Sequence, residues 1–175
     1  MTTMTRDALA AQIAAISSLE GEFTLRSGLV SQTYFDKYRF EGSPELLRPL
    51  AKEMAQLLPS ETEILAGLEL GGVPLATAIS LETGLPAAFV RKEAKTYGTC
   101  QAIEGQDVSG RKITFIEDVI TTGGAVADAF DLSAAAGAEV LAVVCAIWRG
   151  KGSPNIVKQP GLVVRAAFSK SDLTK

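Results

Sequence analysis

The sequence predicts an α/β fold in which a central, mainly parallel sheet is flanked by helices. Three observations support this prediction. Strand-like and helix-like segments alternate from residue 63 onward. The expected strands are apolar along their whole length, as in a parallel sheet that helices cover on both faces. The chain has 175 residues, which is enough for one domain with a sizeable core.

The N-terminal part of the chain is expected to differ from this alternation. Residues 5–19 carry apolar side chains at helical spacing, and Thr5 is placed to cap the helix. Residues 23–38 are rich in aromatic and other β-forming side chains, and they predict two short strands around a turn at Ser27-Gly28. Pro44 favours the first turn of a second helix, which ends near residue 58.

The remainder is predicted to alternate strands with two helices. The helices cover residues 74–82 and 122–136, and Gly84 and Gly137 are placed to end them. The strands cover residues 63–67, 86–91, 112–117, 140–148 and 162–168.

A long polar segment at residues 92–109 shows no apolar period and is predicted to be a loop. Loops of this length are usually solvated linkers or lids over a site, and both interpretations stay open here. In the second one, the loop would deliver its cations to an anionic ligand. These cations are Arg91, Lys92, Lys95 and Arg111.

Composition excludes several classes of function. The chain has no histidine, which excludes Ser-His-Asp and Cys-His mechanisms and the common zinc sites. Seventeen Lys and Arg residues against twenty Asp and Glu residues give a net charge of -3, which argues against nucleic-acid binding through bulk charge. No apolar run approaches the roughly 18 residues of a membrane span, and the first ten residues lack the apolar core of a signal peptide. We therefore expect a cytoplasmic protein.

The most informative segment is ITFIEDVITTGGAV at residues 113–126. A strand-like run leads to Glu117 and Asp118, which we expect in the cleft at the carboxyl ends of the parallel strands. The following Thr-Thr-Gly-Gly turn opens a helix and would point bare amide groups at an anion, since glycine allows a close approach. Carboxylates beside a phosphate cradle suit a ligand with both phosphate and hydroxyl groups, such as ribose 5-phosphate. The segment lacks the lysine of a P-loop and the glycine spacing of a dinucleotide fingerprint.

This segment resembles the phosphoribosyl pyrophosphate (PRPP) motif of the type I phosphoribosyltransferases, and four further segments are similar to orotate phosphoribosyltransferases. They are the substrate segment at 23–28 with Ser31, Tyr34 and Phe35, the pyrophosphate loop at 67–76, the mobile catalytic loop at 91–98, and the Trp148-Arg149 pair that closes a strand.

The resemblance covers residues 20–150 and implies the type I phosphoribosyltransferase fold, with a single domain over residues 1–175. It also implies a small N-terminal hood, mainly from residues 20–42, and a mobile loop at about residues 92–109.

The resemblance further implies which residues bind PRPP. Glu117 and Asp118 would bind the ribose hydroxyls directly or through water on Mg²⁺, and the amides of Thr121 to Ala125 would hold the 5-phosphate. The residues implied to be catalytic are Lys95, Asp118 and Glu117. The residues implied to bind PRPP are Arg26, Gly71, Arg91, Lys92, Lys95, Tyr97, Glu117, Asp118, Val119, Ile120, Thr121, Thr122, Gly123, Gly124 and Ala125.

For orotate, the resemblance implies a site formed by Tyr34, Phe35, Thr121 and Arg149. The two aromatic residues would flank the pyrimidine ring, although neighbouring strand residues point to opposite faces and only one of them is then expected to stack on it. Arg149 would pair with the orotate carboxylate, which suits its planar guanidinium. Arg26 would bind PRPP or orotate.

The implied cofactor is Mg²⁺, held by PRPP and water near the two acids and without a direct protein ligand. The implied assembly is a homodimer, in which Lys92 serves its own subunit while Arg91, Lys95 and Tyr97 reach the partner's site. Two residues depart from the family pattern: Tyr97 stands where histidine is usual, and Gly71 stands where many members have lysine.

The implied reaction joins orotate to PRPP, giving orotidine 5'-phosphate and pyrophosphate, a Mg²⁺-dependent step of pyrimidine (UMP) biosynthesis. The alternatives are a phosphoribosyltransferase for another base and a non-catalytic regulator of the same fold that senses PRPP or nucleotides. Arg149 and the loop lysines argue against a purine enzyme. The acidic chain, which has neither a basic face nor an added nucleic-acid module, argues against the regulator.

Overall fold

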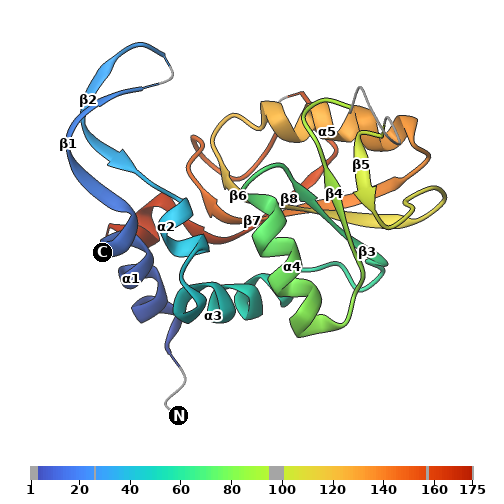
Figure 1. Cartoon of the computed structure of the whole chain (residues 1–175), viewed down its shortest axis with the longest axis horizontal. Coiled ribbons are helices and arrows are strands. Elements are labelled where there is room, and N and C mark those ends of the chain that lie inside the picture. Colours follow the sequence, from blue (N-terminus) through green and yellow to red (C-terminus); the bar gives the residue numbers. More distant parts are fainter. Residues whose placement is uncertain (1–3, 26, 95–100, 157, 175) are drawn as a thin grey trace.

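A mainly parallel sheet forms the centre of the molecule (Figure 1). The computed structural model describes residues 4–25, 27–94, 101–156 and 158–174. Over these ranges the sheet has six strands in the order β5-β4-β3-β6-β7-β8, and only β5 is antiparallel to its neighbour. The strands are β3 (Ile64–Leu68), β4 (Ala87–Val90), β5 (Ile103–Gly105), β6 (Lys112–Ile120), β7 (Glu139–Trp148) and β8 (Val163–Ser169).

Helices cover both faces of this sheet, as the apolar strands predict. One core layer joins α1 (Arg6–Ser17), α3 (Pro44–Ala55) and α4 (Gly72–Thr83) to the sheet through residues such as Leu50. The other layer packs α5 (Gly124–Ala135) onto the opposite face through residues such as Val126. Figure 1 shows α5 on one side of the sheet and the three other helices on the other side. The predicted fold class is confirmed.

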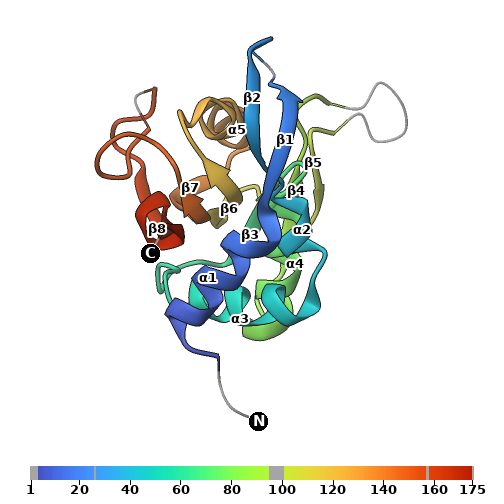
Figure 2. The same cartoon turned by 90° about the vertical axis from the view of Figure 1, so that its left-hand side faces the viewer.

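An antiparallel hairpin of β1 (Ser18–Thr24) and β2 (Val30–Phe35) projects from the body beside α1 (Figure 2). Gly28 takes a φ of 84° in its turn, a left-handed conformation that favours glycine. The short helix α2 (Tyr38–Glu41) then leads into α3. The hairpin and the two predicted N-terminal helices are confirmed, and the Thr5 hydroxyl accepts a hydrogen bond from the Ala8 amide as expected of a cap.

The structure corrects several boundaries, and β1 already begins at Ser18, inside the helix predicted for residues 5–19. Tyr38 lies in helix α2, although it was predicted to be in a strand. The predicted loop at 92–109 contains β5, because an isolated three-residue edge strand leaves no period to detect. Strand β6 continues through the two acids to Ile120, three residues beyond its predicted end, because β7 pairs with it along that whole length.

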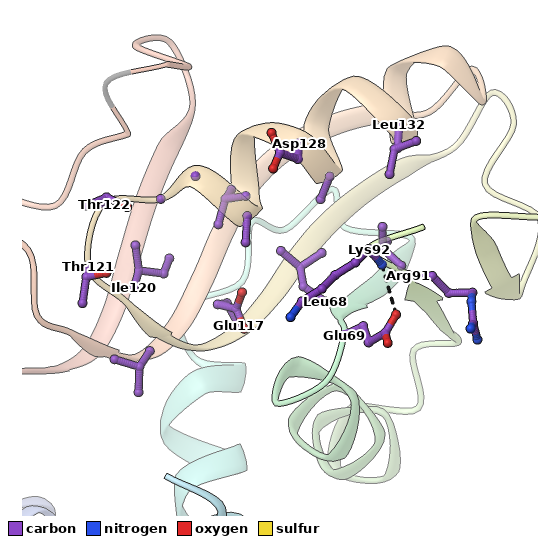
Figure 3. A pocket seen from close by; sticks show the side chains of 17 residues that line it. Leu68, Glu69, Arg91, Lys92, Glu117, Ile120, Thr121, Thr122, Asp128 and Leu132 are labelled. Carbon is purple, nitrogen blue, oxygen red and sulfur yellow. Dashed lines mark hydrogen bonds between the residues drawn. The ribbon is translucent and has the colours of Figure 1, made fainter. Parts of the chain in front are cut away.

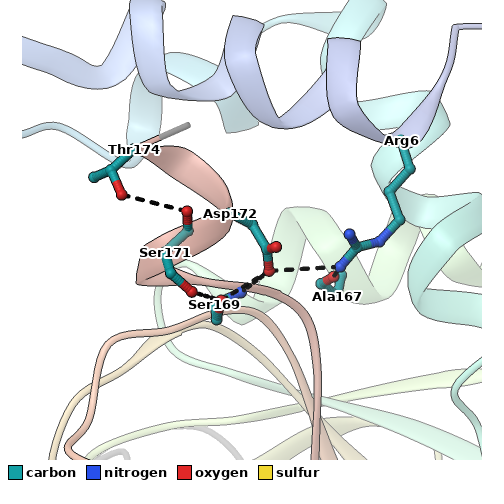
Figure 4. A network of polar contacts seen from close by, with 6 residues as sticks. All are labelled: Arg6, Ala167, Ser169, Ser171, Asp172 and Thr174. Atoms are coloured by element: carbon teal, nitrogen blue, oxygen red, sulfur yellow. Dashed lines mark hydrogen bonds and ion pairs between the residues drawn. The ribbon is translucent and has the colours of Figure 1, made fainter.

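The two ends of the described chain are joined by a polar network around Arg6 (Figure 4). The guanidinium of Arg6 donates to the carbonyl oxygen of Ala167, lies 3.7 Å from the Asp172 carboxylate, and stacks 4.7 Å from the centre of the Phe168 ring. Asp172 also accepts hydrogen bonds from the amide and hydroxyl of Ser169, which caps the short helix η1 (Lys170–Leu173). Helix α1, which carries the hairpin, is therefore anchored to the end of β8.

Over the described ranges, each helix is either too short or too polar to cross a membrane.

The start of α4 lies unusually close to the sheet. A Cβ atom on Gly72 would lie 2.1 Å from the carbonyl oxygen of Ile116, and one on Gly67 would lie 2.7 Å from the carbonyl oxygen of Gly72. Both contacts are with backbone atoms, which cannot rotate away as a side chain can. Glycine at these positions therefore sets the distance between α4 and strands β3 and β6.

We expect Gly72→Ala to lower the free energy of unfolding by about 1–3 kcal/mol, because the added methyl group must displace backbone in a packed layer. Urea denaturation measures the change. Gly161→Ala is the control, since a Cβ atom there meets nothing within 4 Å in the described part of the chain, and its effect should stay within about 0.5 kcal/mol. Equal effects of the two substitutions would contradict the close approach of α4.

Candidate functional site

An open pocket of about 460 Å³ lies where β3, β4 and β6 end and α5 begins (Figure 3). This is the edge at which parallel sheets bind ligands, since the carboxyl ends of the strands and the helix N-termini meet there. Its lining contains ten of the residues predicted to bind PRPP. They are Arg91, Lys92, Glu117, Val119, Ile120, Thr121, Thr122, Gly123, Gly124 and Ala125.

The turn from β6 into α5 forms one wall of the pocket. Gly123 precedes the helix with a φ of 76°, which favours glycine, and this conformation points the chain from the strand into the helix. The first amides of a helix have no acceptor within the helix, and its dipole favours negative charge there. A Cβ atom on Gly124 would meet nothing within 4 Å among the described residues, so the approach to these amides is open. The turn has the geometry of a phosphate cradle.

The two acids of the motif lie inside β6 and therefore face opposite sides of the sheet. Glu117, 7% exposed, lines the pocket. Asp118, 1% exposed, is not among the described residues of the lining. The structure thus brings Glu117, but not Asp118, to the pocket with the phosphate cradle. The contact between Asp118 and ribose stays a prediction.

Hydrogen bonds from the backbone hold both carboxylates. The amide of Asp118 donates to Oε1 of Glu117 at 3.0 Å, and the amide of Val119 donates to Oδ1 of Asp118. Burial and the neighbouring charge of Asp118 raise the pKa of Glu117 well above its ordinary value. Glu117 is therefore able to hold a proton at a higher pH than a solvated carboxylate.

Asp118 is held on the other face by Lys37, which follows β2. Nζ of Lys37 lies 2.5 Å from Oδ2 of Asp118. Burial lowers the pKa of Lys37, but the hydrogen bond to Asp118 and the charges of Asp118 and Glu117 outweigh that effect, so its pKa is raised overall. The predicted PRPP residue Gly71 also lies here, because a Cβ atom on it would fall 1.6 Å from the same Oδ2.

A third carboxylate, Glu41 of α2, joins this group. Its side chain is buried, and neither of its oxygens has a hydrogen-bond partner within the described residues. Burial and the nearby charge of Asp118 raise its pKa to about 8. At neutral pH Glu41 is therefore mostly protonated.

The loop cations lie at the opposite wall of the pocket. Figure 3 shows the Lys92 side chain extending toward Glu117, whereas the guanidinium of Arg91 is directed away from it. The amide of Lys92 donates to Oε2 of Glu69 at 3.0 Å, which ties the end of β4 to the loop between β3 and α4. Arg26, Lys95 and Tyr97, which were also predicted for this site, lie outside the described residues.

The residues predicted for orotate lie between the hood and β7. The guanidinium of Arg149 stacks 5.0 Å from the centre of the Phe35 ring. The amide of Arg149 donates to the carbonyl oxygen of Ile120 at 2.8 Å, which places Arg149 beside Thr121 at the pocket. Tyr34 faces the other way; its ring centre lies 5.5 Å from that of Phe23, and the residue is 44% exposed. As expected for neighbouring strand residues, only Phe35 is on the side of Arg149.

Three residues near the site were missed from the sequence. They are Lys37, Glu41 and Glu69, for which the sequence alone predicts no role in the site. Their partners lie 23 or more positions away along the chain, so no local pattern indicates them. An acid before α3 is not unusual in itself. Glu41 becomes notable only once its burial is known, and the sequence alone does not show that burial.

Comparison with known proteins gives consistent results. The family model described as a phosphoribosyl transferase domain matches residues 42–162. An orotate phosphoribosyltransferase of Nocardioides sp. is 57% identical over 97% of this chain and 96% of the relative. One from Halobacterium salinarum is 40% identical over 97% of this chain and 96% of the relative. The orotate phosphoribosyltransferase of Mycobacterium tuberculosis in complex with PRPP is 28% identical, with a TM-score of 0.82 over 97% of this chain and 99% of that chain.

We expect the buried Glu41 to make stability depend on pH. Its pKa of about 8 in the folded chain lies above the ordinary value of 4.5, so the folded state binds the proton more tightly than the unfolded state. The resulting stability is present at low pH and is lost as the pH rises toward 8. Between pH 5 and pH 8 the loss should be on the order of 3 kcal/mol.

The measurement is urea unfolding at both pH values for the wild type and for Glu41→Gln. The variant should lack most of this loss, because glutamine has no proton to release. Glu45→Gln, which changes an exposed acid of α3, should keep the wild-type dependence. If Glu41→Gln keeps it as well, Glu41 is not the titrating group.

Proposed function

The chain belongs to the orotate phosphoribosyltransferase family, and we propose that it transfers the phosphoribosyl group of PRPP to orotate, giving orotidine 5'-phosphate and pyrophosphate. The observation that supports this most directly is the pocket itself. It joins a phosphate cradle at the start of α5, the carboxylate of Glu117 and the cation Lys92 within one cavity. These groups match the phosphate, the ribose hydroxyls and the pyrophosphate of PRPP, respectively.

In this proposal PRPP lies across the pocket. Its 5-phosphate accepts hydrogen bonds from the amides of Thr121 to Ala125 at the N-terminus of α5. Its ribose hydroxyls donate to Glu117, and its pyrophosphate extends toward Lys92 and the loop at residues 69–71. Orotate then lies between the cradle and the hood, where Arg149 pairs with its carboxylate and Phe35 packs on its ring.

The chemistry follows from this placement. A ring nitrogen of orotate attacks the anomeric carbon, and the bond from that carbon to the pyrophosphate oxygen breaks. The proton that the nitrogen carried passes to the departing pyrophosphate. Positive charge develops on the ribose, and negative charge grows on the leaving pyrophosphate. Glu117 stabilises the first and Lys92 the second, so the main contribution of the protein is electrostatic. The absence of histidine from the sequence is compatible with this step, because orotate provides its own nucleophile.

Mg²⁺ is the cofactor that fits this arrangement. Carboxylate, phosphate and water oxygens are the donors that the ion prefers. It would be held by PRPP and by water beside Glu117, since Asp118 faces the other side of the sheet. When bound, it would neutralise part of the charge on the leaving pyrophosphate. A homodimer and a cytoplasmic location belong to the same proposal and stay predictions.

The first test follows the loss of orotate absorbance with PRPP and Mg²⁺. We expect turnover by the wild type, a fall in kcat/KM of at least about 100-fold for Glu117→Gln, and a rise in the KM for PRPP of about tenfold for Lys92→Met. Glu139→Gln is the matched control, because Glu139 is an exposed acid at the other end of the strands. PRPP binding without consumption of orotate would contradict the proposed base.

The proposed exchange of loops between subunits has its own test. Lys92→Met impairs a site through its own subunit, and Lys95→Ala impairs the site of its partner. The two variants are mixed and assayed with PRPP far below its wild-type KM, where both are impaired. After their subunits exchange, each mixed dimer has one site with both lysines intact. We expect activity to recover to about a quarter of the wild-type value, since half of the dimers are mixed and half of their sites are intact. No recovery, with mixed dimers demonstrated by mass, would contradict the exchange.

A further inference from the structure

Near the loop at residues 69–71 lies a group of ionisable side chains, two of which, Lys37 and Glu41, have no role in the proposed reaction. It consists of the carboxylates of Glu41, Glu117 and Asp118 with the ammonium group of Lys37. Lys37 and Glu41 come from the hood segment, whereas the two other acids come from the centre of the sheet. The group therefore connects two parts of the chain that would hold different substrates.

The charge balance of this group depends on Lys37. Asp118 is 1% exposed, and a buried carboxylate without a partner is strongly unfavourable. In the described part of the chain, the salt bridge to Lys37 is the one ion pair that reaches these acids. Lys37 is itself about one-third exposed at its side chain. The Lys37 side chain therefore extends from the solvent-exposed hood to the buried carboxylate of Asp118.

The same oxygen of Asp118 supports the loop. Oδ2 occupies the space that a side chain on Gly71 would fill, so the carboxylate packs directly on the loop backbone. Glu69, at the start of this loop, accepts a hydrogen bond from the Lys92 amide. The position of Asp118 therefore affects the position of the loop. Through Glu69, it also affects the end of β4, which is followed by Lys92.

We propose that Lys37 is a positioning residue for the transferase reaction: it holds Asp118 against the loop and so sets the loop backbone for the pyrophosphate of PRPP. This inference rests on the proposed function, since it assigns the loop to PRPP. Lys37 acts through Asp118 and not by touching the substrate. It also joins the hood, which carries Phe35, to the pocket that binds phosphate.

The experiment measures the affinity for PRPP by calorimetry, together with KM and kcat, in a double-mutant cycle of Lys37→Met and Asp118→Asn. Methionine keeps the length and apolar stem of the lysine but removes its charge. We expect Lys37→Met to weaken PRPP binding by about tenfold or more, with little change in the KM for orotate. In the Asp118→Asn background, the same substitution should change PRPP binding by less than about twofold, because its target is gone.

Two further variants separate positioning from a general loss of structure. Lys37→Arg retains the charge and should bind PRPP within about threefold of the wild type. Lys52→Met removes an exposed lysine of α3 that pairs with Glu82 of α4, and it should leave the PRPP affinity, KM and kcat unchanged. If Lys37→Met does not fold, Asp118→Asn is compared with the double variant, in which no buried carboxylate loses its partner.

Two results would overturn the proposal. One is wild-type PRPP affinity in Lys37→Met, and the other is a full tenfold loss in the Asp118→Asn background, which would mean direct contact between Lys37 and PRPP. Failure of the proposed function gives a different result. A wild type that binds PRPP but leaves orotate unchanged is not an orotate transferase, and Lys37 is still tested by PRPP affinity. A wild type without affinity for PRPP overturns both proposals.

Discussion

The site depends on one constraint, the alternation of side chains along β6. Because neighbouring residues of a strand face opposite sides of the sheet, Glu117 and Asp118 cannot both line one pocket. Glu117 meets the phosphate cradle on the side of α5, and Asp118 meets the hood and the start of α4 on the other side. The paired acids thus connect the two faces of the sheet at the point where a ligand would bridge them.

Much of this could be predicted from the sequence, because the relevant signals are local. The motif at 113–126 contains the strand, the two acids, the turn and the start of the helix in one continuous segment. Its apolar residues indicate the strand, and its threonines and glycines indicate the turn. The partners of Asp118 could not be predicted in this way. Lys37 reaches it from 81 positions earlier, and Glu41 lies in α2, a short helix that packs against α1 and α3. Such contacts depend on how separate elements pack, which no local pattern reports.

Gly71 shows how packing changes the meaning of a departure from the family pattern. From the sequence, it matters as a missing lysine in the pyrophosphate loop. In the structure, Oδ2 of Asp118 occupies the space beside it, so no side chain of any kind fits while that carboxylate keeps its position. The neighbouring Gly72 is restricted in the same way by the backbone of β6. The two glycines therefore allow the loop to lie directly on the central strand.

The protonation of Glu41 completes this electrostatic arrangement. With a pKa of about 8, Glu41 is mostly neutral at pH 7, so the single positive charge of Lys37 is available to Asp118. If Glu41 were ionised, two buried carboxylates would compete for that charge, and Asp118 would be held less firmly against the loop. Burial of Glu41 thus keeps Lys37 paired with Asp118. The hood contributes to the site through this buried proton as well as through the residues that it would present to a substrate.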